Sequence, residues 1–203
     1  RIIVNKILFT GGGSAGHVSV NVALIPEFKK HGYQISYIGS KKGIEKEMIE
    51  NINDVKYHAI SSGKLRRYFS WENFIDPFKV LKGILDSIFI IKKEKPDFIF
   101  SKGGFVSVPV CVAARLLKVP VVLHESDLTP GLANKINIKF SNHIFTTFED
   151  TLNYLPKGKA SLIGAIVRDA IYGGSKERAY QFTGFSEGKP VILVMGGSLG
   201  SKI

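Results

Sequence analysis

The first residues that could do chemistry form the loop Gly11–His17, which has the sequence GGGSAGH and directly follows the apolar run 6–10. Glycines let a backbone approach a ligand closely, and the helix that follows directs free N–H groups at an anion or an oxygen. The imidazole of His17 can accept a proton from a substrate hydroxyl near neutral pH. A tight turn with a helix-capping histidine is the alternative. The loop lacks the Gly-Lys-Ser/Thr ending of a P-loop, which disfavours ATP hydrolysis. It also does not fit the glycine spacing of the dehydrogenase fingerprint, which disfavours hydride transfer.

A second group of polar side chains also follows an apolar run directly. It offers the imidazole of His124, the carboxylates of Glu125 and Asp127, and the amide of Asn134. Either carboxylate could accept the substrate proton in place of His17. The alternative is that His124 and Glu125 hold neighbouring loops together. The spacing does not match a zinc protease helix, and the sequence has no Asp-X-Asp motif, so we expect no metal and no other cofactor.

Short apolar runs that alternate with longer amphipathic stretches must position these loops. The pattern predicts a parallel sheet with helices on both faces, wound in the right-handed sense, in an α/β Rossmann-like fold. In such a sheet ligands bind outside the carboxyl ends of the strands, where both polar groups lie. The predicted strands are 6–10, 34–38, 55–60, 97–101, 119–123, 143–147, 160–163 and 191–195, and the predicted helices are 18–30, 44–51, 79–95, one opening near Pro109, and 131–140.

Composition restricts the class of protein further. Lys and Arg outnumber Asp and Glu by 28 to 17, which leaves a formal charge of +11 and predicts attraction to phosphates. The single cysteine, Cys111, lies in an apolar run and is expected to be a core residue of a protein in a reducing compartment. No apolar run is long enough to span a membrane. A nucleic-acid-binding module is disfavoured because the only basic and aromatic cluster, 64–74, has no repeat and no RNP-like motif.

The chain contains five motifs in the order Gly11–His17, Ser101–Pro109, His124–Asn134, Gly164–Arg168 and Gly196–Gly200. With these motifs the sequence resembles the MurG family of bacterial N-acetylglucosaminyltransferases, in its Gram-positive type. The resemblance implies a GT-B fold of two Rossmann-like domains, with the second domain only begun here. We therefore expect an acceptor-binding domain at 1–170, a connector at 171–189 and the start of a donor-binding domain at 190–203, in a piece that is inactive alone.

The resemblance also implies an activity. Members move N-acetylglucosamine from UDP-N-acetylglucosamine to the MurNAc 4-hydroxyl of lipid I and invert the configuration at the anomeric carbon. The product, lipid II, is used for peptidoglycan synthesis, which supports cell shape and division. Such an enzyme works as a peripheral protein on the cytoplasmic face of the cell membrane. The alternative is another GT-B UDP-sugar transferase with a lipid or natural-product acceptor, and the motif at 105–109 argues against it.

Roles carry over motif by motif. The family's loop places His17 at the reaction centre, where its imidazole suits the role of base. Glu125 and Asp127 are the other catalytic candidates, because they follow a neighbouring strand and a carboxylate can do the same work. Ser14 and Ala15 replace two glycines of the family's loop, and Asp127 replaces an asparagine that contacts the sugar, which puts that contact in doubt because a carboxylate cannot donate a hydrogen bond. The residues implied in donor and substrate binding are Gly12, Gly13, Ser14, Ala15, Gly16, Gly104, Asp127, Asn134, Arg168 and Ser198, the last two on the UDP part.

The segment 64–74 has a composition typical of membrane interfaces. Aromatic rings favour the headgroup level of a bilayer, and basic side chains are attracted to anionic lipid. We expect it to dock the protein on the membrane that holds the undecaprenyl-linked acceptor, although Trp71 and Phe74 could instead pack on the domain. The expected contacts are Lys64, Leu65, Arg66, Arg67, Tyr68, Phe69, Trp71 and Phe74.

Overall fold

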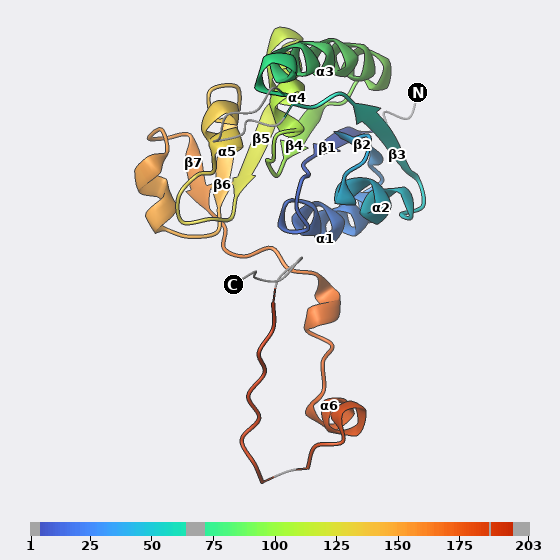
Figure 1. Ribbon diagram of the computed structural model, residues 1–203, viewed down its shortest axis with the longest axis vertical. Coiled ribbons are helices and arrows are strands. Elements are labelled where there is room, and N and C mark those ends of the chain that lie inside the picture. The colour runs from blue at the N-terminus through green and yellow to red at the C-terminus, as the bar shows by residue number, and fades with distance from the viewer. Residues whose placement is uncertain (1–4, 64–71, 187, 197–203) are drawn as a thin grey trace.

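A seven-stranded, all-parallel sheet forms the centre of the computed structural model, which describes residues 5–63, 72–186 and 188–196 (Figure 1). The strand order is β3-β2-β1-β4-β5-β6-β7, so the chain adds strands on one side of β1 and then on the other. The strands are β1 (Lys6–Thr10), β2 (Gln34–Ser40), β3 (Val55–Ile60), β4 (Phe98–Ser101), β5 (Val121–Glu125), β6 (His143–Thr146) and β7 (Ala160–Leu162).

Helices cover both faces of the sheet, as predicted. On one face lie α1 (Gly16–Lys30) and α2 (Ile44–Glu50). On the other lie α3 (Glu72–Glu94) and α4 (Ser107–Leu116), with α5 (Leu132–Asn137) against α4 (Figure 1). The remaining helical segments are η1 (Asp150–Tyr154), η2 (Asp169–Ile171) and α6 (Lys176–Thr183).

The core divides into two layers because successive side chains of a strand point to opposite faces. On β1, Ile7 and Phe9 are buried among residues of α1 and α2, whereas Leu8 packs in the cluster of α3 and α4. Cys111 of α4 is fully buried in the second cluster, and burial raises the pKa of its thiol to about 12. The expectation that Cys111 is a core residue is therefore confirmed.

Two expected elements differ most from the structure. Helix α3 begins at Glu72, before the predicted start at 79. The prediction began late because the apolar repeat that indicates the helix starts only at Val80. The predicted strand 191–195 was wrong: residues 190–196 have no strand partner among the described residues, and side chains such as Ile192 and Val194 are almost fully exposed. A strand needs a neighbour for its backbone N–H and C=O groups.

The segment after the sheet extends away from it (Figure 1). It is not irregular throughout, because α6 forms within the predicted connector. The hydroxyl of Ser175 accepts a hydrogen bond from the backbone N–H of Arg178 at 3.1 Å and caps the helix start. Gly184, with a φ of 71°, ends the helix in the left-handed conformation that glycine allows.

Candidate active site

The glycine loops after β1 and β4 meet where the strand order reverses. Backbone N–H of Gly12 donates to the carbonyl oxygen of Gly103 at 3.3 Å, which joins the two loops. A Cβ added to Gly104 would collide with the carbonyl oxygen of Gly12, and the φ of 82° at Gly104 also favours glycine. The reversal point of a doubly wound sheet is where ligands bind, so the two loops form the floor of a candidate site.

A cleft of about 520 Å³ opens above these loops. It is lined by the loops that follow the first five strands, β1 to β5, because the carboxyl ends of parallel strands meet at one edge of the sheet. The structure brings together here the expected residues Gly12, Gly13, Ser14, His17, Gly104, Glu125, Asp127 and Asn134.

His17 lies half-buried in the first turn of α1, and its ring is held on one side. Its Nδ1 is 3.1 Å from the carbonyl oxygen of Gly12 and 3.1 Å from the hydroxyl of Ser14. A carbonyl oxygen can only accept, so the bond to Gly12 requires a proton on Nδ1 and leaves Nε2 unprotonated in the neutral ring. This tautomer can take a proton from a substrate.

The surroundings of His17, above all its burial, lower its pKa and favour the neutral ring. Burial lowers the pKa of His17 most, and the nearby ammonium group of Lys102 lowers it further. The hydrogen bond to Gly12 and the carboxylates of Asp127 and Glu125 act in the opposite direction but do not cancel the effect. A pKa below 6.5 leaves the imidazole ready to accept a proton near pH 7.

The two other catalytic candidates differ in their surroundings. Glu125 is buried, and both of its oxygens are occupied: Oε1 accepts from the backbone N–H of Asp127 at 2.9 Å and Oε2 from Nδ2 of Asn134 at 2.8 Å. This geometry favours the interpretation that Glu125 holds loops together. Asp127 is exposed at the cleft and is the freer carboxylate.

The expectations from sequence omitted two buried charged residues near the site. Lys102, directly after β4, is 1% exposed, and its Nζ donates to the hydroxyl of Ser126 at 2.9 Å. Burial lowers the pKa of Lys102, against the effect of Glu125 and Asp127. Its position after a buried strand was a usable signal. Glu45, at the start of α2, is fully buried beside the glycine loop, and as one glutamate of the charged helix IEKEMIE it carried no such signal.

Several expected site residues lie elsewhere. Ala15 and Gly16 are at the start of α1 but do not line the cleft, and Arg168 is exposed beyond the sheet, also outside the cleft. Ser198 and the expected membrane contacts at 64–71 lie outside the described residues, as does the side chain of Phe74. Among the residues that the structure describes, no group of three or more His, Cys, Asp or Glu side chains could hold a metal ion.

The sheet order, with glycine loops and a cleft at its reversal point, defines a Rossmann-like α/β domain of the GT-B type. The family model described as the glycosyltransferase family 28 N-terminal domain matches residues 7–146. The chain therefore belongs to glycosyltransferase family 28.

Sequence relatives agree with this assignment. Over 200 residues the chain is 64% identical to the UDP-N-acetylglucosamine--N-acetylmuramyl-(pentapeptide) pyrophosphoryl-undecaprenol N-acetylglucosamine transferase of Staphylococcus saprophyticus, and equally identical to the enzyme of that name from Staphylococcus aureus. The match covers 98% of this chain and 56% of each relative. The chain thus spans about half the length of the curated relatives it matches.

Solved structures show the same fold. The MurG crystal structure from Acinetobacter baumannii matches with a TM-score of 0.67 at 24% identity, over 81% of this chain and 46% of that one. A glycosyltransferase from Rickettsia africae matches with a TM-score of 0.64 at 14% identity, over 91% and 51%. A UDP-GlcNAc 2-epimerase from Neisseria meningitidis, bound to UDP-GlcNAc, matches with a TM-score of 0.56 at 16% identity, over 77% and 45%. At these identities the likeness concerns the fold alone.

Proposed function

We propose that the chain is part of an inverting N-acetylglucosaminyltransferase that moves N-acetylglucosamine from UDP-N-acetylglucosamine to the MurNAc 4-hydroxyl of lipid I. Residues 1–170 would bind the acceptor, 171–189 would connect, and 190–203 would begin a donor-binding domain. The observation that carries the proposal is His17, fixed through Nδ1 in the cleft of a family 28 domain with Nε2 unprotonated. The names of the Staphylococcus relatives support the choice of substrates.

The reaction follows from the chemistry of this site. Nε2 of His17 takes the proton of the acceptor hydroxyl while that oxygen forms a bond to the anomeric carbon of the donor sugar. The bond from that carbon to the diphosphate oxygen breaks, and UDP leaves with the electron pair. Arg168 and the loop 196–200 are proposed to bind UDP, since a guanidinium and backbone amides stabilise phosphate charge.

A test of the proposed function uses the full-length protein, a lipid I analogue and UDP-N-acetylglucosamine. The parent should form the lipid II analogue, and His17→Gln should lower kcat by about 10² to 10⁴ without loss of fold, because it removes the base. Asp127→Asn is the companion variant, since Asp127 is the exposed carboxylate of the cleft. A loss below about fivefold in His17→Gln, with a large loss in Asp127→Asn, would move the role of base to Asp127.

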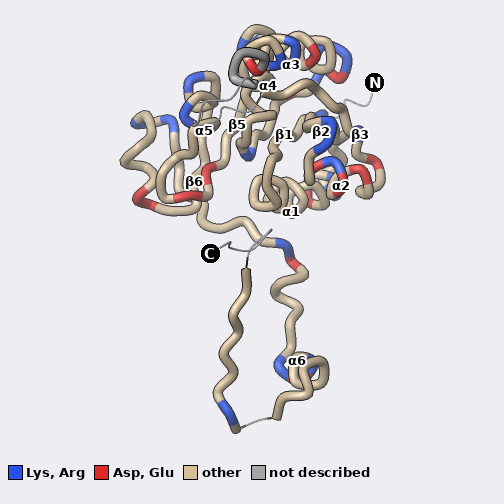
Figure 2. Tube along the Cα trace, viewed as in Figure 1, with Lys and Arg blue, Asp and Glu red and all other residues tan. Residues whose placement is uncertain are grey.

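We also propose that the protein docks peripherally on the cytoplasmic face of the membrane that holds the acceptor. Helix α3 continues the segment 64–71 and carries an exposed apolar stripe at helical spacing. Helix α3 carries both basic and acidic residues and lies on the opposite side of the sheet domain from the C-terminal segment (Figure 2). No helix among the described residues is long and apolar enough to cross a bilayer. The stripe consists of Phe78, Leu81, Leu85 and Phe89, with 51–74% of each side chain exposed.

A further inference from the structure

One peptide group connects His17 to a buried carboxylate on another element. The carbonyl oxygen of Gly12, which accepts from Nδ1 of His17, and the N–H of Gly13 belong to the same peptide unit. That N–H donates to Oε2 of Glu45 at 3.2 Å. Hydrogen bonds in a chain polarise one another, and a charged acceptor on the N–H makes the carbonyl a stronger acceptor. Glu45 thus acts on the Nδ1 side of the imidazole.

Glu45 is built into this place. Its other oxygen, Oε1, accepts from the backbone N–H of Ser40 at 2.9 Å and from the Ser40 hydroxyl at 2.5 Å. The side chain is fully buried, and a Cβ added at Gly12, Gly39 or Gly43 would collide with it. These three glycines therefore leave room for the Glu45 side chain, which joins the end of β2 to the glycine loop after β1.

The carbonyl of Gly12 decides which tautomer His17 adopts. Among the described residues Nδ1 has two hydrogen-bond partners, Gly12 and Ser14. The Ser14 hydroxyl suits both tautomers, because it can accept from a protonated Nδ1 or donate to a bare one. The carbonyl suits only the protonated Nδ1. The other charged groups that face His17 are Lys102, Glu125 and Asp127, and none of them bonds Nδ1.

We propose that Glu45 is a positioning residue that acts through the Gly12–Gly13 peptide group to keep Nδ1 of His17 protonated and Nε2 free for the acceptor proton. The proposal rests on the proposed function, in which His17 is the base. It assigns to Glu45 the place that a third group takes in other catalytic sites, where it orients the base without touching substrate.

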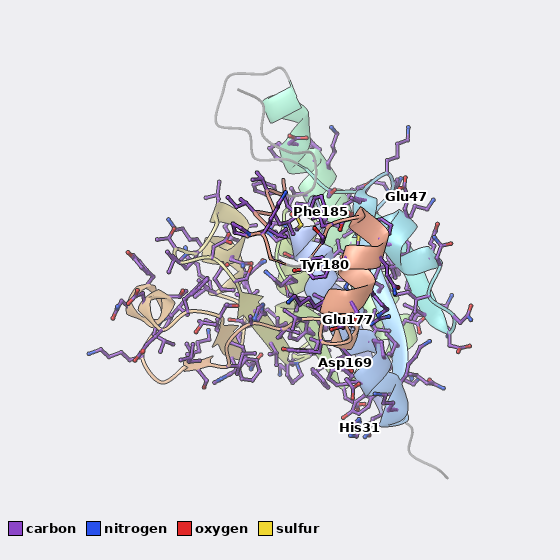
Figure 3. All side chains as sticks on the ribbon, turned by 90° about the horizontal axis from the view of Figure 1, so that it is seen from below. His31, Glu47, Asp169, Glu177, Tyr180 and Phe185 are labelled. Carbon is purple, nitrogen blue, oxygen red and sulfur yellow. The ribbon has the colours of Figure 1, made fainter. Side chains whose placement is uncertain are left out.

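Nitrogen NMR of ¹⁵N-histidine-labelled full-length protein tests the proposal without reference to activity. In the parent, neutral His17, assigned by its loss in His17→Gln, should be protonated at Nδ1. In Glu45→Gln the Nε2–H form should gain population, because one amide oxygen cannot serve all three donors. Glu47→Gln, at an exposed site on the same helix (Figure 3), is the matched control and should leave the signals unchanged.

Kinetics supply the second measurement. Glu45→Gln should lower kcat by roughly tenfold, less than removal of the base itself, while KM for the donor stays within about twofold. An unchanged His17 signal in folded Glu45→Gln would overturn the proposal. A tautomer shift with full turnover would support the role of Glu45 and instead contradict His17 as the base.

A shorter side chain covers the case in which Glu45→Gln does not fold. Glu45→Asp keeps the charge, but it lacks one methylene and should reach Ser40 without reaching Gly13. It should shift the tautomer in the same direction, because the hydrogen bond to Gly13 is lost. An unchanged spectrum in this variant would likewise overturn the proposal.

Discussion

At the scale of single residues, the pKa of His17 depends on the charge of Lys102. A cation disfavours the protonated imidazole, so removal of the Lys102 ammonium should raise the pKa of His17. Glu125 and Asp127, which favour the protonated form, would then be opposed by burial alone and no longer by a nearby cation. Because the base works only when unprotonated, the acid limb of kcat/KM should move to higher pH in Lys102→Met.

The pH profile of the full-length enzyme measures this shift. Lys41→Met is the control, because Lys41 is exposed after β2 and outside the cleft, and it should leave the limb in place. A limb that moves to lower pH in Lys102→Met, or does not move, would contradict the electrostatic role of Lys102.

At the scale of elements, the contact between the loops after β1 and β4 requires glycine at 104. Gly104→Ala combines a collision with the Gly12 carbonyl oxygen and a φ of 82°, which costs an L-residue energy. We expect the midpoint of thermal unfolding of the full-length protein to fall by roughly 2–10 °C.

Gly173→Ala provides the comparison for this loss. Gly173 has only the carbonyl oxygen of Ala170 near its added Cβ, at an ordinary distance of 3.7 Å. Its unfolding midpoint should match that of the parent. Equal midpoints for Gly104→Ala and Gly173→Ala would mean that the two glycine loops can separate without cost.

The apolar stripe of α3 makes a second prediction at this scale. Leu81→Glu combined with Leu85→Glu should reduce sedimentation with anionic vesicles, because it places charge on the face proposed to meet lipid. Ile171→Glu, at an exposed apolar position beyond the sheet, is the control and should sediment like the parent.

A second double variant tests the basic residues of the segment 64–71, which precedes α3 in the chain. Each Lys or Arg near an anionic surface contributes about 1 kcal/mol, so Arg66→Glu with Arg67→Glu should also weaken binding. High salt should weaken it as well. Parent-like sedimentation of both double variants would place any membrane contact elsewhere.

At the scale of the whole molecule, we expect the 203-residue chain to bind UDP-N-acetylglucosamine poorly and to show no transfer. Arg168 lies outside the cleft, and the apolar segment 191–195 has no strand partner among the described residues. Calorimetry against the full-length protein measures the difference, with circular dichroism as the check on folding. Equal affinity would show that the loops after β1 and β4 carry the nucleotide by themselves.

Much of the fold and of the site was predictable from local pattern. Apolar runs and helical repeats are properties of neighbouring residues, so they located the seven strands that pair and the loops that follow them. The carboxyl ends of parallel strands share one edge, which was enough to predict that His17, Glu125 and Asp127 lie at one cleft.

Local pattern did not decide how distant residues pair. The apolar run 191–195 looks like a buried strand, but a strand exists only where a neighbour supplies hydrogen bonds, and none is present among the described residues. Glu45 looks like a surface residue of a charged helix, yet the order of β2 beside β1 buries it against the Gly12–Gly13 peptide. The amino-acid sequence by itself determined which residues follow each strand. Only the tertiary structure decided that Glu45 and His17 bond to the same peptide group, because the contact between Gly13 and Glu45 joins residues 32 apart in the chain.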